Sequence, residues 1–372
     1  MQDVPLTLVH PFERCERLFG GKTVVTATAD GALERRTYAE WADRTRRLGG
    51  VFDDLGLSAD ARVGTFGWNS ERHLELYFAA PCSGRVLHTL NIRLFPEQLV
   101  YIANHAEDEI VFCDRSLIPV LWPHLDDMKT VKHVVVMDDS GGADDAPPVP
   151  DDASVLDYES LIAAASPVEW HVTDEGQAAA VCYTSGTTGN PKGVVYSHRS
   201  SLLHALGVLT ADSAGLSEAD VVLPVVPMFH ANAWGLAHAG VLCGAAQVMP
   251  GPDLTPAAIA RLIKAEQVTV AGGVPTIWMG MLPLLDAGDA DISSLRTILC
   301  GGSAVPRVLM EGYHRHGVWI SHAWGMTETS PIASLSHIKS SLRPVSEQGE
   351  VELRLTQGLP SPLVDSRIVE PG

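Results

Sequence analysis

Residues 183–193 read Tyr-Thr-Ser-Gly-Thr-Thr-Gly-Asn-Pro-Lys-Gly, and this stretch constrains the fold more than any other part of the sequence. The apolar runs at 178–182 and 194–196 predict two strands that present the stretch as a loop. Its glycines leave the backbone free to turn, so N–H groups, hydroxyls and the Lys192 ammonium can converge on phosphate oxygens. The sequence therefore predicts a polyphosphate-binding loop between two strands.

Two other interpretations of this loop have to be considered. A Walker A loop requires a glycine immediately before its lysine and a serine or threonine immediately after it. Pro191 and Gly193 stand at those two positions, so the Walker A interpretation fails. A glycine-rich hairpin without any ligand is the remaining alternative.

Residues 184–193 resemble the phosphate loop of the adenylate-forming superfamily, which includes acyl-CoA synthetases, aryl-CoA ligases, luciferases and the adenylation domains of peptide synthetases. Residues 322–329, His-Ala-Trp-Gly-Met-Thr-Glu-Thr, resemble the superfamily's aromatic-Gly-X-Thr-Glu motif. Between them, residues 227–234 and 301–306 are similar to its acyl-site and adenine-site segments. The resemblance extends over the whole chain, which looks most like bacterial medium- and long-chain fatty acyl-CoA synthetases.

Apolar runs alternate with helical patterns over most of the chain. This alternation predicts an α/β fold of right-handed βαβ units, with helices on both faces of parallel sheets. Strands are expected at 62–66, 85–90, 109–113, 133–137, 221–226, 247–249, 268–271 and 297–300. One helix is expected to begin at the capping-box pair Thr37 and Glu40. Further helices are expected at 71–81, 96–105, 117–125, 232–243 and 256–266.

The stretch 138–152, rich in Asp, Pro, Gly and Ala, is the expected boundary between two α/β subdomains. We expect a first subdomain at 1–150 and a second at 151–340 that holds the ATP and acyl site. Period-two alternation within 350–370 predicts antiparallel strands, so residues 341–372 are expected to begin a small β subdomain. The resemblance implies the large N-terminal domain of the adenylate-forming fold. It also implies a C-terminal domain with a catalytic lysine, which this chain lacks, so a truncated chain of impaired activity is expected.

Composition narrows the class of partners. A net charge of −19 over 372 residues argues against nucleic acid and anionic membrane surfaces. No apolar run approaches the roughly 18 residues of a membrane span, and we expect no export signal, because the first residues have neither a basic start nor an apolar run. The six cysteines lack zinc-ligand spacing, which is typical of reduced packing residues. We expect a cytoplasmic protein with small-molecule partners, and the resemblance adds a possible homodimer.

The resemblance implies roles for individual residues of the two motifs. Glu328 and Thr184 would hold Mg²⁺, a hard cation that takes oxygen ligands. Thr327 would hydrogen-bond the α-phosphate, and Lys192 would place a positive charge on the β- and γ-phosphates. The phosphate loop would contribute Thr184, Ser185, Gly186, Thr187, Thr188 and Gly189. The alternatives are a solvated surface acid for Glu328, an ordinary turn residue for Thr327 and a surface lysine for Lys192.

The resemblance also implies adenine and acyl sites. The adenine pocket would comprise Gly301, Gly302, Ser303, Trp324 and Gly325, with the main-chain groups of His322 and Ala323. Trp324 would stack on the base, although a tryptophan beside a strand end can also belong to the core. His230, Ala231 and Trp234 would border the acyl site, with Trp234 as an aromatic gate. His230 and Trp234 would share one cavity if Asn232 opens a helix, and a packed core pair is the alternative.

The function that the resemblance implies uses ATP, Mg²⁺ and coenzyme A. A fatty acid carboxylate would be activated to an acyl-adenylate with release of pyrophosphate and then transferred to coenzyme A. The carboxylate is already a nucleophile near neutral pH, so the site must supply charge neutralisation rather than a general base. Two alternatives stay open: a binding protein that holds nucleotide or acyl-adenylate with little turnover, and a ligase for aryl or other carboxylic acids.

Overall fold

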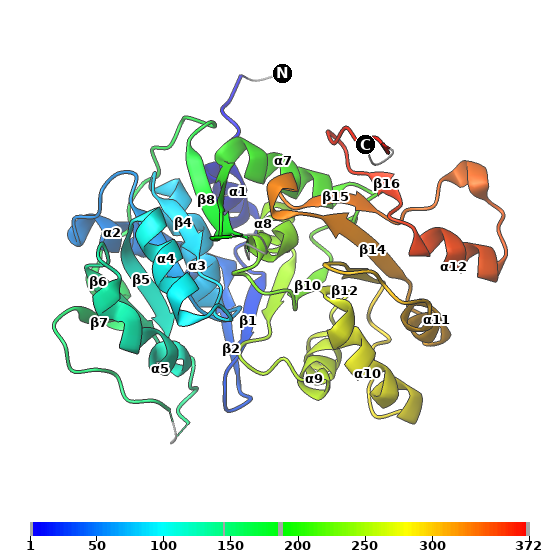
Figure 1. Ribbon diagram of the computed structural model, residues 1–372, viewed down its shortest axis with the longest axis horizontal. Coiled ribbons are helices and arrows are strands. Elements are labelled where there is room, and N and C mark those ends of the chain that lie inside the picture. Colours follow the sequence, from blue (N-terminus) through cyan, green and yellow to red (C-terminus); the bar gives the residue numbers. More distant parts are fainter. Residues whose placement is uncertain (1–2, 144–145, 185–188, 370–372) are drawn as a thin grey trace.

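Two β-sheets and the helices around them make up the protein, whose computed structural model describes residues 3–143, 146–184 and 189–369 (Figure 1). The strands are β1 (Thr23–Ala27), β2 (Leu33–Thr37), β3 (Arg62–Phe66), β4 (Val86–Thr89), β5 (Asp108–Asp114), β6 (His133–Met137), β7 (Val155–Asp157), β8 (Ala178–Tyr183), β9 (Gly193–Ser197), β10 (Val221–Pro224), β11 (Ala246–Met249), β12 (Val270–Gly273), β13 (Thr297–Cys300), β14 (Ile320–Gly325), β15 (Ile332–Leu335) and β16 (Leu359–Pro360). The helices are α1 (Val9–Phe19), α2 (Tyr38–Asp54), α3 (Glu71–Cys82), α4 (Pro96–Ala106), α5 (Ile118–Leu121), α6 (Tyr158–Ala164), α7 (His198–Leu209), α8 (Leu236–Cys243), α9 (Pro256–Glu266), α10 (Pro275–Ala287), α11 (Arg307–Arg315) and α12 (Glu347–Leu355).

Local sequence signals account for many of these bounds. The expected strands 62–66, 133–137 and 297–300 are β3, β6 and β13, and the helix expected at 256–266 is α9. The capping box at the start of α2 is confirmed, because the Thr37 hydroxyl accepts from the Glu40 N–H and the Glu40 carboxylate accepts from the Thr37 N–H. The helix expected at 117–125 is broken into α5 and two flanking 3₁₀ turns. Pro123, which lacks an N–H, begins the break after α5.

The strands form two mixed sheets with parallel centres. Within the described residues, one sheet has the order β7-β6-β5-β3-β4-β8-β9 and the other the order β16-β15-β14-β13-β12-β10-β11-β1-β2. In the first, β9 runs antiparallel to its partner β8, and the other described strands pair in parallel. In the second, β10 to β14 are parallel, and antiparallel strands β2, β15 and β16 extend the two ends. The α/β fold expected from the sequence is confirmed.

Helices fill the space between the sheets and cover both outer faces (Figure 1). Buried side chains of α1, α2, α3, α7 and α8 share one hydrophobic core with strands of both sheets, and Trp41 on α2 is fully buried there. Helices α4 and α5 pack on the other face of the seven-stranded sheet. Helices α9 to α12 pack on the other face of the nine-stranded sheet. Because the helices cover the faces of the sheets, loops lie at the strand ends, where a ligand could enter.

The two sheets do not part at residue 150. Strands β6 and β7, on either side of residues 138–152, pair with each other in the seven-stranded sheet, and β8 and β9 belong to it as well. The β1–β2 hairpin crosses over in the opposite sense and joins the nine-stranded sheet beside β11. The expected ranges 1–150 and 151–340 therefore do not describe the sheets. How far any part of the chain folds independently stays a prediction.

Of the antiparallel strands expected within 350–370, the described residues form only the two-residue β16, and residues 347–355 are the helix α12. Ser346 caps this helix by accepting from the Gly349 N–H, and Glu350 pairs with Arg354 one turn later. Val351 and Leu355, which suggested a period of two, are also four residues apart and so share one helical face against the core. β16 pairs antiparallel with β15 and so extends the nine-stranded sheet. In the described ranges no helix is long and apolar enough to span a bilayer.

Candidate active site

The expected phosphate loop lies between β8 and β9, which form the predicted hairpin. Tyr183 pairs with Gly193, and the Thr184 N–H donates to the Lys192 carbonyl over 3.0 Å. This bond places Thr184 next to Lys192, which is exposed, as is Gly189. The expected loop residues Ser185, Gly186, Thr187 and Thr188 lie outside the described residues.

The second motif belongs to the nine-stranded sheet and lies beside the β8–β9 hairpin. The turn that carries Thr327 and Glu328 lies between β14 and β15, and the Tyr196 hydroxyl on β9 donates to the Thr327 carbonyl over 2.6 Å. Burial raises the pKa of Tyr196, and the charges of Cys182 and Glu328 add to this rise. Glu328 therefore lies near the hairpin. The structure makes neighbours of two motifs that are far apart in the sequence.

A cleft opens beside this contact, at the carboxyl ends of β10, β13 and β14, where open α/β sheets commonly bind ligands. The lining residues expected from the sequence are His230, Ala231, Trp234, Gly301, Gly302, Ala323, Trp324, Gly325 and Thr327. Met326, Pro331 and Ile332 also line the cleft and were not expected. Their positions in the sequence could have indicated them, because Met326 lies inside the second motif and the other two lie within three residues of its end. Trp324 is 42% exposed, so it is a cleft wall rather than a core residue.

Two of the expected adenine-site residues do not line the cleft. Ser303 is exposed outside it. The His322 N–H donates to the Ser336 hydroxyl over 2.8 Å, and its carbonyl accepts from the Ser336 N–H over 2.9 Å. Its Nδ1 lies 3.2 Å from the Leu355 carbonyl, and burial lowers the pKa of this histidine. Both main-chain groups of His322 are thus used within the protein, which corrects the expectation that they face the nucleotide.

Close backbone packing explains a glycine in the cleft floor. A Cβ atom on Gly301 would lie 2.5 Å from the Ala323 carbonyl oxygen on the adjacent strand. We expect Gly301→Ala to lower the free energy of unfolding by about 1–3 kcal/mol and to weaken ATP binding, because β13 and β14 must separate where they form the cleft. Gly21→Ala is the control, since a Cβ there meets nothing within 4 Å. Urea unfolding and calorimetric titration would measure the two effects, and equal behaviour of both variants would contradict the prediction.

The chain between β10 and α8 forms a left-handed turn. Ala231, Asn232, Ala233 and Trp234 have φ values of 43°, 52°, 51° and 54°, and Gly235 follows at 75°. This conformation costs about 1–2 kcal/mol for each residue that carries a Cβ. Such strain persists only where surrounding contacts hold the backbone in place. The helix expected to begin at Asn232 therefore begins only at Leu236.

His230 and Trp234 line the same cleft through this turn and not through one face of a helix. Desolvation by the surrounding protein lowers the pKa of His230, and the positive charge of Arg93 lowers it further. The imidazole is therefore neutral at neutral pH and can donate an N–H without adding a charge. Trp234 is buried, and its ring lies 3.7 Å from the Cβ position of Gly302. Both side chains belong to the cleft and are more than a packed core pair.

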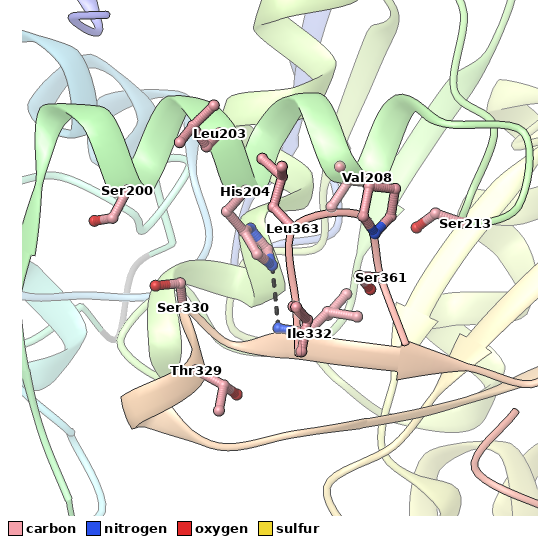
Figure 2. Close-up of a pocket in the computed structure, with 13 residues that line it drawn as sticks. Ser200, Leu203, His204, Val208, Ser213, Thr329, Ser330, Ile332, Ser361 and Leu363 are labelled. Carbon is pink, nitrogen blue, oxygen red and sulfur yellow. Dashed lines mark hydrogen bonds between the residues drawn. The ribbon is translucent and has the colours of Figure 1, made fainter. Parts of the chain in front are cut away.

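A second cavity, of about 210 Å³, shares Ile332 with the cleft (Figure 2). Helix α7 supplies Leu203, His204 and Val208 to its wall, and Leu363 covers another side. His204 Nε2 accepts from the Ile332 N–H over 3.1 Å, as the dashed line in Figure 2 marks. Burial lowers the pKa of His204 to about 4, so the ring is neutral at physiological pH. The cavity is thus lined by apolar groups and uncharged hydrogen-bonding groups.

Solved structures share the architecture of this protein. The anthranilate CoA ligase AuaEII in complex with anthranoyl-AMP matches with a TM-score of 0.80 at 22% identity, over 94% of this chain and 68% of that chain. A long-chain-fatty-acid-CoA ligase from Archaeoglobus fulgidus matches with a TM-score of 0.79 at 23% identity, over 97% and 70% of the two chains. At such identities the likeness shows the fold, which is that of the large N-terminal domain of adenylate-forming enzymes.

Sequence comparison narrows the class to a family. The family model described as AMP-binding enzyme matches residues 12–372, and the chain belongs to this family. A long-chain-fatty-acid–CoA ligase of Thermus thermophilus is 44% identical over 371 residues, which are 100% of this chain and 66% of that relative. A medium-chain-fatty-acid–CoA ligase of Ectopseudomonas oleovorans is 38% identical over 361 residues, which are 96% of this chain and 65% of that relative. The chain thus spans slightly less than two thirds of the length of these two curated relatives.

Proposed function

We propose that this chain carries the nucleotide and acyl sites of an AMP-forming fatty acid–CoA ligase. The observation that supports this most directly is the hydrogen bond from Tyr196 to Thr327, which joins the phosphate-loop hairpin to the turn with Glu328 at the edge of the cleft. The names of the long- and medium-chain relatives support fatty acid as the substrate. In the reaction, a carboxylate oxygen of the fatty acid attacks the α-phosphorus of ATP and pyrophosphate leaves. The thiol of coenzyme A then displaces AMP from the acyl group.

The described residues can neutralise and orient the triphosphate. The protein carries a net charge of −19, so positive potential for ATP must be created locally. Lys192, exposed at the loop end of the hairpin, offers its ammonium to the β- and γ-phosphates. Thr327 at the cleft edge offers its hydroxyl to the α-phosphate, and Trp324 provides a ring against which adenine can stack. Such fixed donors stabilise charge in the transition state without needing to reorganise.

The donor set at Glu328 fits a magnesium ion. Glu328 is exposed and forms no ion pair with residues 3–143, 146–184 or 189–369. Mg²⁺ is commonly held by one or two protein oxygens together with water and substrate phosphates. A closed protein cage is not needed, and no group of three or more His, Cys, Asp or Glu side chains suited to a metal occurs among the described residues. Held by Glu328 and Thr184, Mg²⁺ would neutralise charge on the triphosphate and on the departing pyrophosphate.

The acyl group is proposed to enter between the left-handed turn and β15. His230 and Trp234 line the cleft from the turn, and Ile332 lines it from β15. The neutral His230 can donate to a carboxylate oxygen while its ring contributes no charge that would hold back the nucleophile. Because Ile332 also lines the second cavity, an alkyl chain that passes Trp234 and Ile332 would find apolar surface from Leu203 and Val208. This arrangement supports an aliphatic substrate.

Trp234→Ala should change chain-length preference more than nucleotide affinity. Removing the indole opens the wall of the cleft beside Gly302 and leaves the residues proposed to hold phosphate unaltered. We expect affinities for hydrolysis-resistant acyl-adenylate analogues of different chain lengths to shift relative to one another by about 3–10-fold, with AMP affinity nearly unchanged. Trp122→Ala, outside the cleft on the seven-stranded sheet's outer face, is the control. Equal losses for all chain lengths would argue against the gate.

Two measurements test the proposed function. Calorimetric titration should detect magnesium-dependent binding of ATP, and a pyrophosphate-exchange assay with fatty acids should detect formation of acyl-adenylate. A second candidate, which the sequence also leaves open, is a protein that binds nucleotide with little turnover. Binding without exchange would favour that candidate. The absence of ATP binding would contradict both.

We also propose a cytoplasmic location and a homodimer. The acidic net charge argues against binding to anionic surfaces, which is compatible with a cytoplasmic location. Light scattering behind size-exclusion chromatography would measure the mass against the 39.8 kDa of one chain, and a monomer at all concentrations would contradict the dimer.

A further inference from the structure

A buried side chain from the other sheet holds the segment that leads into the left-handed turn. Asn69 follows β3 of the seven-stranded sheet, whereas the segment follows β10 of the nine-stranded sheet. The Asn69 amide Nδ2 donates to the carbonyls of Pro224 over 2.7 Å and Val226 over 2.9 Å, and Oδ1 accepts from the Met228 N–H over 2.7 Å. Asn69 is only 5% exposed. Its carboxamide therefore fixes three backbone groups of a segment in the opposite sheet.

Three further side chains continue this contact toward the cleft. The hydroxyl of Tyr77 on α3, which is fully buried, donates to the Met228 carbonyl. Thr89 at the end of β4 donates its hydroxyl to the Phe229 carbonyl over 3.4 Å. Cys182 at the end of β8 donates its thiol to the Asn232 side-chain oxygen over 3.2 Å. All of them belong to the seven-stranded sheet or pack beside it, so these hydrogen bonds tie the segment and the turn to that sheet.

A left-handed turn of residues with side chains needs such support, because nothing in its own backbone favours the conformation. His230 and Trp234 line the cleft, whereas Asn69 and Tyr77 do not. We propose that Asn69 and Tyr77 are positioning residues that set the place of His230 and Trp234 and thereby tune binding of the acyl group. The inference rests on the proposed function, since it assigns His230 and Trp234 to the acyl part of the ligand.

A pair of tyrosines allows a matched test. Tyr77 and Tyr313 are both fully buried, and each donates its hydroxyl to a main-chain carbonyl, that of Met228 for Tyr77 and that of Trp278 for Tyr313. Only the first carbonyl lies next to the turn. Tyr77→Phe and Tyr313→Phe should both lower the urea midpoint, because each loses one buried hydrogen bond. Only Tyr77→Phe should weaken binding of a hydrolysis-resistant acyl-adenylate analogue, by about tenfold more than binding of AMP.

A pair of asparagines gives an independent version of the test. Asn104 also ties a segment with both ends of its carboxamide, to the Asp127 carbonyl over 2.8 Å and the Lys129 N–H over 2.7 Å, but on α4 outside the cleft. In Asn69→Asp, a carboxylate oxygen would face the carbonyls of Pro224 and Val226 and repel them. Asn104→Asp is the control for this change. The selective loss of acyl-adenylate affinity is expected for Asn69→Asp alone.

Calorimetry with AMP and with the acyl-adenylate analogue separates the outcomes. A selective loss in Tyr77→Phe and Asn69→Asp, absent from both controls, supports the inference. Equal losses for AMP and the analogue, or the same selective loss in Tyr313→Phe, would overturn it, because the effect would then follow general stability. Failure of the unaltered chain to bind either ligand would instead contradict the proposed function, and with it this inference.

Discussion

Glu328→Gln is expected to lower the magnesium-dependent affinity for ATP by at least about 10–100-fold. Outer partners of a bound metal are already worth that much in affinity, so the loss of a direct carboxylate ligand should cost no less. Without magnesium the sign reverses, because an ionised Glu328 repels the triphosphate and the neutral amide does not. Titration of ATP in excess Mg²⁺ and again in excess EDTA would measure both effects. The difference between the two conditions is the quantity that this prediction concerns.

An exposed acid far from the cleft provides the control. Glu97 lies in the first turn of α4, is exposed, and forms no ion pair within the part of the chain that the structure describes. Glu97→Gln removes the same charge and should leave both titrations unchanged. A loss of ATP affinity in Glu328→Gln that is the same with and without magnesium would sink the assignment of Glu328 as a metal ligand. It would indicate that the substitution disturbs the turn beside Thr327.

Elements whose signals are local could be predicted from the sequence. The capping box of Thr37 and Glu40 fixed the start of α2, and Thr255 followed by Pro256 marked the start of α9. The apolar runs of β3 and β6 were visible because strands buried on both faces need no polar alternation. In each case the residues that determine the element lie within it or at its end.

Features that depend on distant contacts were not predictable in the same way. The β1–β2 hairpin joins the nine-stranded sheet because β1 pairs with β11, about 220 positions away. Asn69 and Tyr77 hold the segment that leads into the left-handed turn at Ala231–Gly235, Cys182 bonds Asn232 within the turn, and no local sequence pattern predicts this conformation. In α12, a period of two and a helical face were both compatible with Val351 and Leu355, and the cap at Ser346 favoured the helix. Tertiary context decided each of these features.

The residues of the candidate site show the same difference between local signals and distant contacts. Backbone-dominated positions such as Gly301 and Gly325 followed from the motifs, because no larger residue fits: a Cβ on Gly325 would lie 1.9 Å from the Pro331 carbonyl oxygen. The contact between Tyr196 and Thr327 joins two sheets and could be expected only in outline. His322 was assigned to the nucleotide by its place in the motif, whereas pairing with Ser336 uses both of its main-chain groups. A motif indicates which residues lie near the site. The pairing of strands then determines which of their main-chain groups remain available to a ligand.

Acid should destabilise this protein in part through buried histidines between the sheets. His238 is packed against Tyr77 and Phe78, and burial, followed by the charges of His204 and His198, lowers its pKa to about 3. In the unfolded chain the same side chain binds a proton near pH 6.5. Between these values the unfolded state binds more protons, so the stability that a neutral His238 confers is complete above pH 6.5 and is lost as the pH falls toward 3.

The variant His238→Met isolates this contribution, since methionine does not titrate and is compatible with an apolar site. We expect its free energy of unfolding to fall less steeply on acidification than that of the parent, by up to about 1.4 kcal/mol per pH unit below pH 6.5. Buried Asp108 and Asp114 have pKa values that burial raises, and they act in the opposite direction in both proteins, so the difference between the two curves is the informative quantity. Exposed His171→Met is the control and should keep the slope of the parent. Parallel curves for parent and His238→Met would show that the buried imidazole is already protonated or hydrated in the folded state.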